Sequence, residues 1–116
     1  MNIEELREYC NSLKGVTEDI KWGHDLCFCI GGKMFAVTGL GGNPVGISFK
    51  VTDDEFDEVS TAQGFIPAPY LARNKWVYLR DTSMLSRKKL EQYILQSYQL
   101  IASKLPKKTQ RELGLI

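Results

Sequence analysis

The residues with the clearest potential for metal chemistry are His24, Cys27 and Cys29, with Cys10 as a fourth candidate. Thiolate and imidazole groups are the ligands that zinc prefers. On a strand, however, Cys27 and Cys29 share one face, whereas His24, three residues before Cys27, points to the other. No Cys-x-x-Cys pair occurs, and free cysteines commonly pack as small buried hydrophobic residues. The pattern therefore favours core cysteines, and we expect no metal and no cofactor.

Catalytic patterns are also weak. A nucleophile needs a neighbouring base, but His24 is the single histidine and no Gly-x-Ser-x-Gly elbow occurs. The turn "GLGGNP" lacks the spacing of a phosphate-binding loop and does not join a strand to a helix. The acids of residues 53–58 lack the spacing of a calcium loop and suit the start of a helix, where the dipole favours negative charge. We therefore predict that the protein is not an enzyme.

The distribution of charge is more informative than the formal net charge of +1. Residues 1–66 contain five Lys/Arg against eleven Asp/Glu, whereas residues 67–116 contain ten against three. Such asymmetry indicates a nucleic-acid or acidic partner for the basic part. Two alternatives remain: the two parts attract each other within the fold, or the charges solvate separate faces.

Within the basic part, cations gather at two places. One group flanks a predicted hairpin turn beside Trp76, and the other lies at the far end of the last predicted helix. The candidate nucleic-acid-binding residues are Arg73, Lys75, Lys104, Lys107, Lys108 and Arg111. With so few cations we expect weak, salt-sensitive binding of double-stranded DNA through its phosphates.

The same residues have structural explanations. Trp76 suits a core, and "SKLPKK" suits a helix C-terminus, where the dipole favours positive charge. The basic run Arg87–Lys89 differs, because it begins the last predicted helix, where the dipole disfavours positive charge. A local cost of this kind can mark a functional surface.

The chain length of 116 residues is typical of one domain, which we place at residues 1–116. Helical periodicity, strand alternation, capping residues and glycine or proline breaks divide the chain into elements. We predict, in order, a helix over 3–13 capped by Asn2, strands at 19–22, 25–31, 33–40 and 45–51 with a Gly31–Gly32 hairpin turn, a helix over 53–63, an extended segment over 65–74, a strand over 75–81, and a helix over 87–105 that ends at Pro106. This order predicts an α+β fold: a two-layer sandwich of an antiparallel sheet with N-terminal, middle and C-terminal helices.

Composition and the N-terminal residues bear on location. No apolar run approaches the roughly 20 residues of a membrane span. The start, "MNIEELREYC", has acids where an export signal has basic residues. The three cysteines form no disulfide framework. We therefore expect a cytoplasmic protein without membrane contact, and we expect a monomer.

Three stretches carry a family resemblance: "KGVTEDIKWGHDLCFCIGGKMFAV", "GFIPAPYLARNKWVYL" and "QSYQLIASKLPKK". In this order they resemble the YjbR/MmcQ-like family of small bacterial proteins over almost the full chain, with "GLGGNP" as a looser hairpin than the family pattern. The resemblance implies a frataxin-like α+β fold and DNA binding through a double wing of β-hairpins, and it brings no catalytic residues. Within its last motif, Ser97 suits close helix–sheet packing, and Tyr98 suits a hydrogen bond to a strand carbonyl.

Two other functions stay open. The protein could be an interaction or regulatory module that uses its acidic helices, with Glu4, Glu5 and Glu8 on the first. It could also bind a small ligand in a pocket near Trp22, His24 and Trp76.

Overall fold

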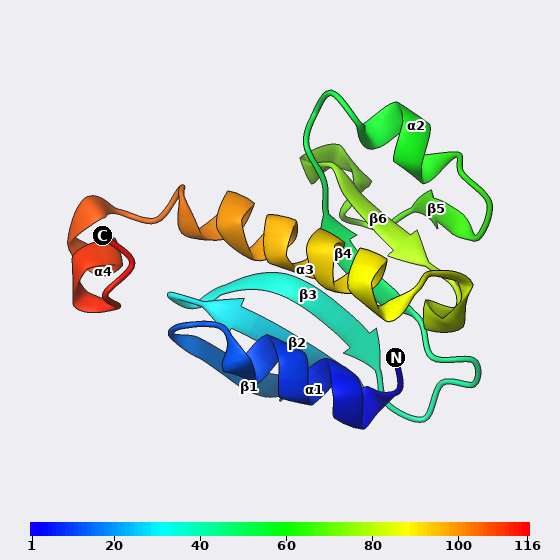
Figure 1. Cartoon of the computed structure of the whole chain (residues 1–116), viewed down its shortest axis with the longest axis horizontal. Helices are drawn as coiled ribbons and strands as arrows, with labels where there is room; N and C mark the ends of the chain where they lie inside the picture. The colour runs from blue at the N-terminus through cyan, green and yellow to red at the C-terminus, as the bar shows by residue number, and fades with distance from the viewer.

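The computed structural model describes residues 1–116 and shows a six-stranded antiparallel sheet with helices packed on it (Figure 1). The strands follow the spatial order β1-β2-β3-β4-β6-β5. The elements are α1 (Ile3–Ser12), β1 (Val16–Lys21), β2 (Asp25–Ile30), β3 (Lys33–Gly39), β4 (Ile47–Lys50), α2 (Phe56–Ser60), β5 (Phe65–Pro67), the 3-10 helix η1 (Ala72–Asn74), β6 (Trp76–Leu79), the 3-10 helix η2 (Thr82–Met84), α3 (Arg87–Ala102) and α4 (Lys107–Glu112). The predicted α+β class and antiparallel sheet are confirmed.

The start of α1 follows the predicted capping. The Glu5 backbone N–H donates to the Asn2 side-chain oxygen at 2.8 Å, and the Asn2 backbone N–H donates to Glu5 Oε1 at 3.0 Å. This reciprocal capping box satisfies two amides that a helix start otherwise leaves unpaired. Asn2 is thus the N-cap, as the sequence predicted.

The β2–β3 hairpin forms for the predicted reason. Gly31 and Gly32 have φ angles of +57° and +80°, which suit a two-residue turn of the type that matches strand twist. A Cβ at Gly31 would also lie 2.7 Å from Leu105 Cδ1, in the turn after α3, so a larger residue would force the Leu105 side chain to move. Along β2, Leu26, Phe28 and Ile30 join the main core, in agreement with the predicted alternation.

The core lies between the sheet and the helices, with Leu90 and Ile94 of α3 fully buried in it. The close approach of α3 to the sheet is fixed by Ser97, whose hydroxyl donates to the Phe35 carbonyl at 2.6 Å and accepts from the Lys50 backbone N–H at 2.9 Å. The Tyr98 hydroxyl donates to the Lys14 carbonyl at 2.6 Å. Lys14 lies in the turn before β1, so the acceptor is not the expected strand carbonyl.

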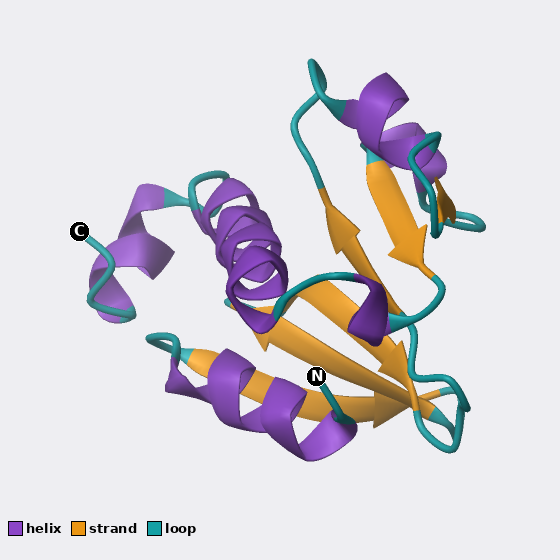
Figure 2. Ribbon diagram, turned by 45° about the vertical axis from the view of Figure 1, so that its right-hand side comes forward, coloured by secondary structure: helices purple, strands orange, loops and turns teal.

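The other face of the sheet carries no α-helix (Figure 2), and the connection of residues 68–75, which includes η1, lies over part of it. We call this face the open face. Strand alternation and register place on it Cys27, Cys29, Met34, Val37, Ser48, Lys50, Trp76 and Tyr78. Cys10 lies in the core on the helix-covered side, so the sheet separates it from Cys27 and Cys29. No three His, Cys, Asp or Glu side chains lie close enough together to hold a metal ion.

Two predicted segments differ from the structure. The second helix is limited to Phe56–Ser60. In the turn before it, the Thr52 backbone N–H donates to Glu55 Oε1 and the Glu55 backbone N–H donates to the Thr52 hydroxyl, the reciprocal pattern of a capping box. The segment expected to be extended over residues 65–74 has only the short strand β5, followed by the turn of η1. Lys75 then takes a left-handed conformation with φ of +65°.

The end of the chain differs most. The last predicted helix stops at Ala102, and Pro106 starts α4, which was not predicted. Proline suits a helix start, because its missing N–H would have no partner there. The Gln110 side chain holds α4 in place by donating to the carbonyls of Leu105 at 2.7 Å and Ser103 at 3.3 Å. No helix in the fold combines the length and the apolar character needed to cross a membrane.

Candidate nucleic-acid interface

The six cations predicted from the sequence share one property in the structure. None of Arg73, Lys75, Lys104, Lys107, Lys108 and Arg111 has a carboxylate oxygen within 4.0 Å. By contrast, Arg7 and Arg87 each form an ion pair, with Glu18 and Glu5 respectively. The candidate residues thus remain free of internal charge partners, as do all Lys and Arg residues of the protein other than Arg7 and Arg87.

Arg73 and Lys75 lie in the connection between the paired strands β5 and β6, residues 68–75, rather than in a tight hairpin turn. Arg73 is exposed on η1. Lys75 is half-buried, with its Nζ 5.1 Å from the centre of the Phe56 ring, a favourable cation–π contact. The connection is therefore ordered by its own contacts and holds both cations near the end of β6.

The other exposed cations, Lys107, Lys108 and Arg111, lie on α4 at one end of the molecule (Figure 1). The explanation of "SKLPKK" as a helix C-terminal cap is wrong for Lys107 and Lys108, because both begin a new helix. Positive charge is disfavoured at that end by the helix dipole. The fold therefore gives these two lysines no stabilising role.

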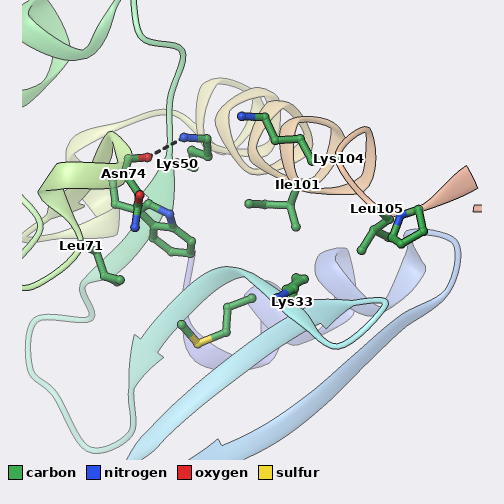
Figure 3. A pocket seen from close by; sticks show the side chains of 10 residues that line it. Lys33, Lys50, Leu71, Asn74, Ile101, Lys104 and Leu105 are labelled. Carbon is green, nitrogen blue, oxygen red and sulfur yellow. Dashed lines mark hydrogen bonds between the residues drawn. The ribbon is translucent and has the colours of Figure 1, made fainter. Parts of the chain in front are cut away.

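Lys104 connects the two groups. It lines a pocket of about 370 Å³ between the C-terminal end of α3 and the sheet, and Asn74, between Arg73 and Lys75, lines the same pocket (Figure 3). Lys33 and Lys50 also reach this pocket, which we call the lysine pocket. Sequence reasoning missed both, since they belong to the part of the chain that is acidic overall. The register of Lys50 opposite Trp76 is visible only in the structure.

The charged form of Lys50 is destabilised in the lysine pocket when no ligand is bound. Burial of Lys50, together with the nearby charges of Lys104 and Lys75, lowers the pKa of its ammonium group, and Asp53 offsets this only in part. The Lys50 Nζ donates to the Asn74 carbonyl at 2.5 Å, but it has no carboxylate within 4.0 Å. A bound anion would remove this repulsion.

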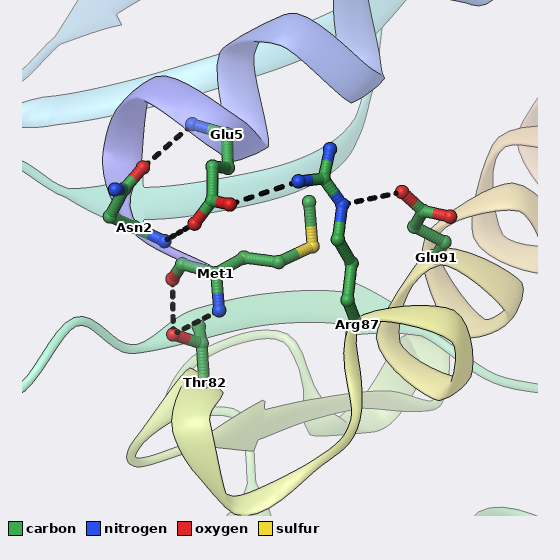
Figure 4. A network of polar contacts seen from close by, with 6 residues as sticks. All are labelled: Met1, Asn2, Glu5, Thr82, Arg87 and Glu91. Carbon is green, nitrogen blue, oxygen red and sulfur yellow. Dashed lines mark hydrogen bonds and ion pairs between the residues drawn. The ribbon is translucent and has the colours of Figure 1, made fainter.

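Two residues of the basic run at the start of α3, Arg87 and Lys89, make contacts within the fold. Arg87 donates through Nη1 to Glu5 Oε2 at 2.9 Å and through Nε to Glu91 Oε2 at 3.0 Å (Figure 4). Lys89 Nζ lies 5.1 Å from the centre of the Tyr93 ring. Arg87 is therefore occupied by contacts within the protein, which weakens the hypothesis that this run marks a functional surface.

The Arg87–Glu5 pair is also the one ion pair that joins the acidic part of the chain to the basic part. Mutual attraction of the two parts thus neutralises little of the basic excess.

Trp76, the aromatic residue beside the predicted cations in the sequence, is only 4% exposed and offers them no exposed ring. The alternative interpretation, a packed tryptophan, is correct, and its ring helps to line the lysine pocket. The exposed aromatic side chains are Trp22, at 68%, and the fully exposed Tyr70. Trp22 is a candidate for a ligand pocket in the sequence, but it lies just after β1 rather than in the predicted strand, and nothing in the sequence singles out Tyr70.

Comparisons with known proteins agree with this fold. The crystal structure of the Deinococcus radiodurans protein DR2400, described by its domain of unknown function DUF419, matches with a TM-score of 0.88 and 26% identity, over 97% of this chain and 88% of that one. A Pseudomonas syringae protein of known structure matches with a TM-score of 0.71 and 20% identity, over 86% of this chain and 98% of that one. No curated protein matches in sequence. The family model named YjbR matches residues 11–100, and the chain therefore belongs to the YjbR family.

Proposed function

We propose that the protein binds double-stranded DNA through the phosphate backbone. The observation that carries the proposal is that the six predicted cations have no carboxylate partners. Contacts of cations with phosphates supply most of the affinity in sequence-independent binding. A non-enzymatic role in the cytoplasm fits such a module.

The arrangement of hairpins supports the same proposal. The β2–β3 hairpin ends at Gly31–Gly32 with Lys33 directly after it, and the β5–β6 connection carries Arg73 and Lys75. Both border the lysine pocket, as does the end of α3. Two cationic hairpin ends on either side of a helix end suit a double wing that spans a groove of the duplex.

The alternative of a protein partner for the acidic helices has less support. Glu5, one of the three acids of α1 that it requires, already caps the helix and pairs with Arg87.

The test is the fluorescence anisotropy of a labelled duplex titrated with the protein at ~50 and ~200 mM salt. Binding through about six phosphates should weaken roughly 10³-fold over that range. We expect the double substitution Lys107→Glu with Lys108→Glu to abolish binding at the lower salt.

The matched control is Arg80→Glu with Lys88→Glu, which changes net charge equally at exposed positions outside the candidate interface. It should retain most of the affinity. Equal losses in both double variants would show that only net charge matters, and no binding by the wild type at the lower salt would refute the proposal.

A further inference from the structure

The open face of the sheet contains a second and larger pocket, of about 640 Å³. Its walls include Trp22, Tyr70 and Val37, and we call it the aromatic pocket. Met34 and Leu71 line both this pocket and the lysine pocket, so the two are adjacent compartments of one trough. Volumes of this size are typical of small-molecule sites, which are mostly apolar with a few charged groups.

The aromatic pocket exposes side chains that the fold does not need. Trp22 and Tyr70 are the two most exposed large hydrophobic residues of the protein. Both also have a left-handed backbone, with φ of +54° and +66°. That conformation is unfavourable for bulky residues, and such strain is typical of functional sites.

The lysine pocket gives the trough a positive end. Lys33 comes from β3, Lys50 from β4 and Lys104 from the turn after α3, and Figure 3 shows Lys33 across the pocket from the other two. None of the three has a carboxylate within 4.0 Å. Asp25, by contrast, lines the aromatic pocket, and its carboxylate lies 3.7 Å from His24 Nε2. The trough therefore has a positive end, formed by the three lysines, and a carboxylate at its other end. An anionic group would bind at the lysine end.

We propose that this trough binds a small organic anion with a flat apolar body. The body lies in the aromatic pocket against Trp22, Tyr70 and Met34. The carboxylate, sulfonate or phosphate group is held by Lys33, Lys50 and Lys104. The site differs from the proposed DNA surface on Arg73 and α4, although the two share Lys33 and Lys104.

The test uses 1-anilinonaphthalene-8-sulfonate, a flat apolar anion that fluoresces when it leaves water. We expect one saturable site per chain in the folded protein. The double substitution Lys50→Met with Lys104→Met should weaken this probe at least about tenfold, because hydrogen bonds to charged groups are lost. The neutral analogue N-phenyl-1-naphthylamine should keep its affinity for the same variant, since it has no anionic group.

The aromatic compartment is tested separately. Trp22→Ala with Tyr70→Ala should weaken both probes. The control Ile20→Ala should weaken neither, because it removes an exposed apolar side chain on the edge strand β1, outside the trough. Melting curves confirm that each variant is folded.

Three results would overturn the proposal: several weak sites per chain, equal loss of both probes in the lysine variant, or no binding of the anionic probe. The DNA proposal fails independently. Lys107→Glu with Lys108→Glu should leave the affinity for the anionic probe unchanged even where DNA binding is lost.

Discussion

The two faces of the sheet differ in how completely their side chains are buried and hydrogen-bonded. On the helix-covered face, residues such as Phe28 and Ile94 are fully buried, and the hydroxyls of Ser97 and Tyr98 find backbone partners. The open face keeps lysines without carboxylate partners beside exposed aromatic rings. The contrast teaches that most of the packing that stabilises the fold lies on one face, whereas the other face keeps charged and aromatic groups available for the proposed ligand.

Backbone conformation follows the same division. Two of the three non-glycine residues with positive φ, Trp22 and Tyr70, line the aromatic pocket on the open face. The third, Lys75, lies against Phe56, which packs on the core. The two strained residues of the aromatic pocket are thus also highly exposed, which is the pattern expected when binding rather than stability retains the strain.

The largest expected effect comes from truncating the helix-covered core. Phe28→Ala removes a fully buried ring whose centre lies 6.5 Å from that of Phe35. We expect the free energy of unfolding to fall by about 3–5 kcal/mol, measured by urea denaturation. Val37→Ala, on the open face, is the comparison and should cost clearly less. Equal losses would contradict the division between the faces.

A smaller loss is expected at Ser97, which joins α3 to the sheet. Ser97→Ala leaves the buried Phe35 carbonyl and the Lys50 amide without this partner, at a cost of about 1–3 kcal/mol. Ser83→Ala is the control, since its hydroxyl bonds only to the exposed carboxylate of Asp81. If both variants unfolded at the same urea concentration, Ser97 would not be the link between the layers.

The helix-covered face could largely be predicted from the sequence, because its pattern is local and periodic. Alternation in β2, the glycines at Gly31–Gly32 and the Asn2 cap each specify their own conformation. The helix α4 could not be predicted in this way, since a proline after a helical pattern is typical of a helix end and the following six residues have no apolar stripe. Its anchor is a single amide side chain, Gln110.

The candidate site could be predicted only in part. Arg73 and Lys104 stand out because the second part of the chain is basic. Strand pairing in the sheet brings Lys33 and Lys50 to the same pocket. Both lie in the part of the chain that is acidic overall, so the charge distribution along the sequence does not reveal them. A site assembled on the open face depends on which strands become neighbours, and charge counted along the chain carries no such information.

A substitution at Trp22 should raise the stability of the protein, whereas Phe28→Ala and Ser97→Ala lower it. Trp22→Gly relieves a left-handed conformation that costs an ordinary residue about 1–2 kcal/mol, at an entropic cost of about 0.5–1 kcal/mol. We expect stability to rise by up to about 1 kcal/mol in urea denaturation, while affinity for the anionic naphthalene probe falls. A loss of stability comparable to that of Phe28→Ala would show that Trp22 belongs to the core instead.

The smallest expected effect is a pH dependence at Lys50. Its pKa is lowered in the folded protein, first by burial and then by Lys104, from an ordinary value of 10.5. Between the lowered pKa and 10.5 the unfolded chain binds more protons than the folded one, so stability rises with pH in that window.

Lys50→Met removes this contribution, so the wild type should gain stability relative to the variant as pH increases through the window. Urea denaturation of both proteins at a series of alkaline pH values measures the difference, with Lys88→Met as the control for losing a lysine. A constant difference across the series would mean that Lys50 is well hydrated in the folded protein. The repulsion that favours anion binding in the lysine pocket would then be absent. The open face would differ from the helix-covered face in its packing but no longer in its electrostatics.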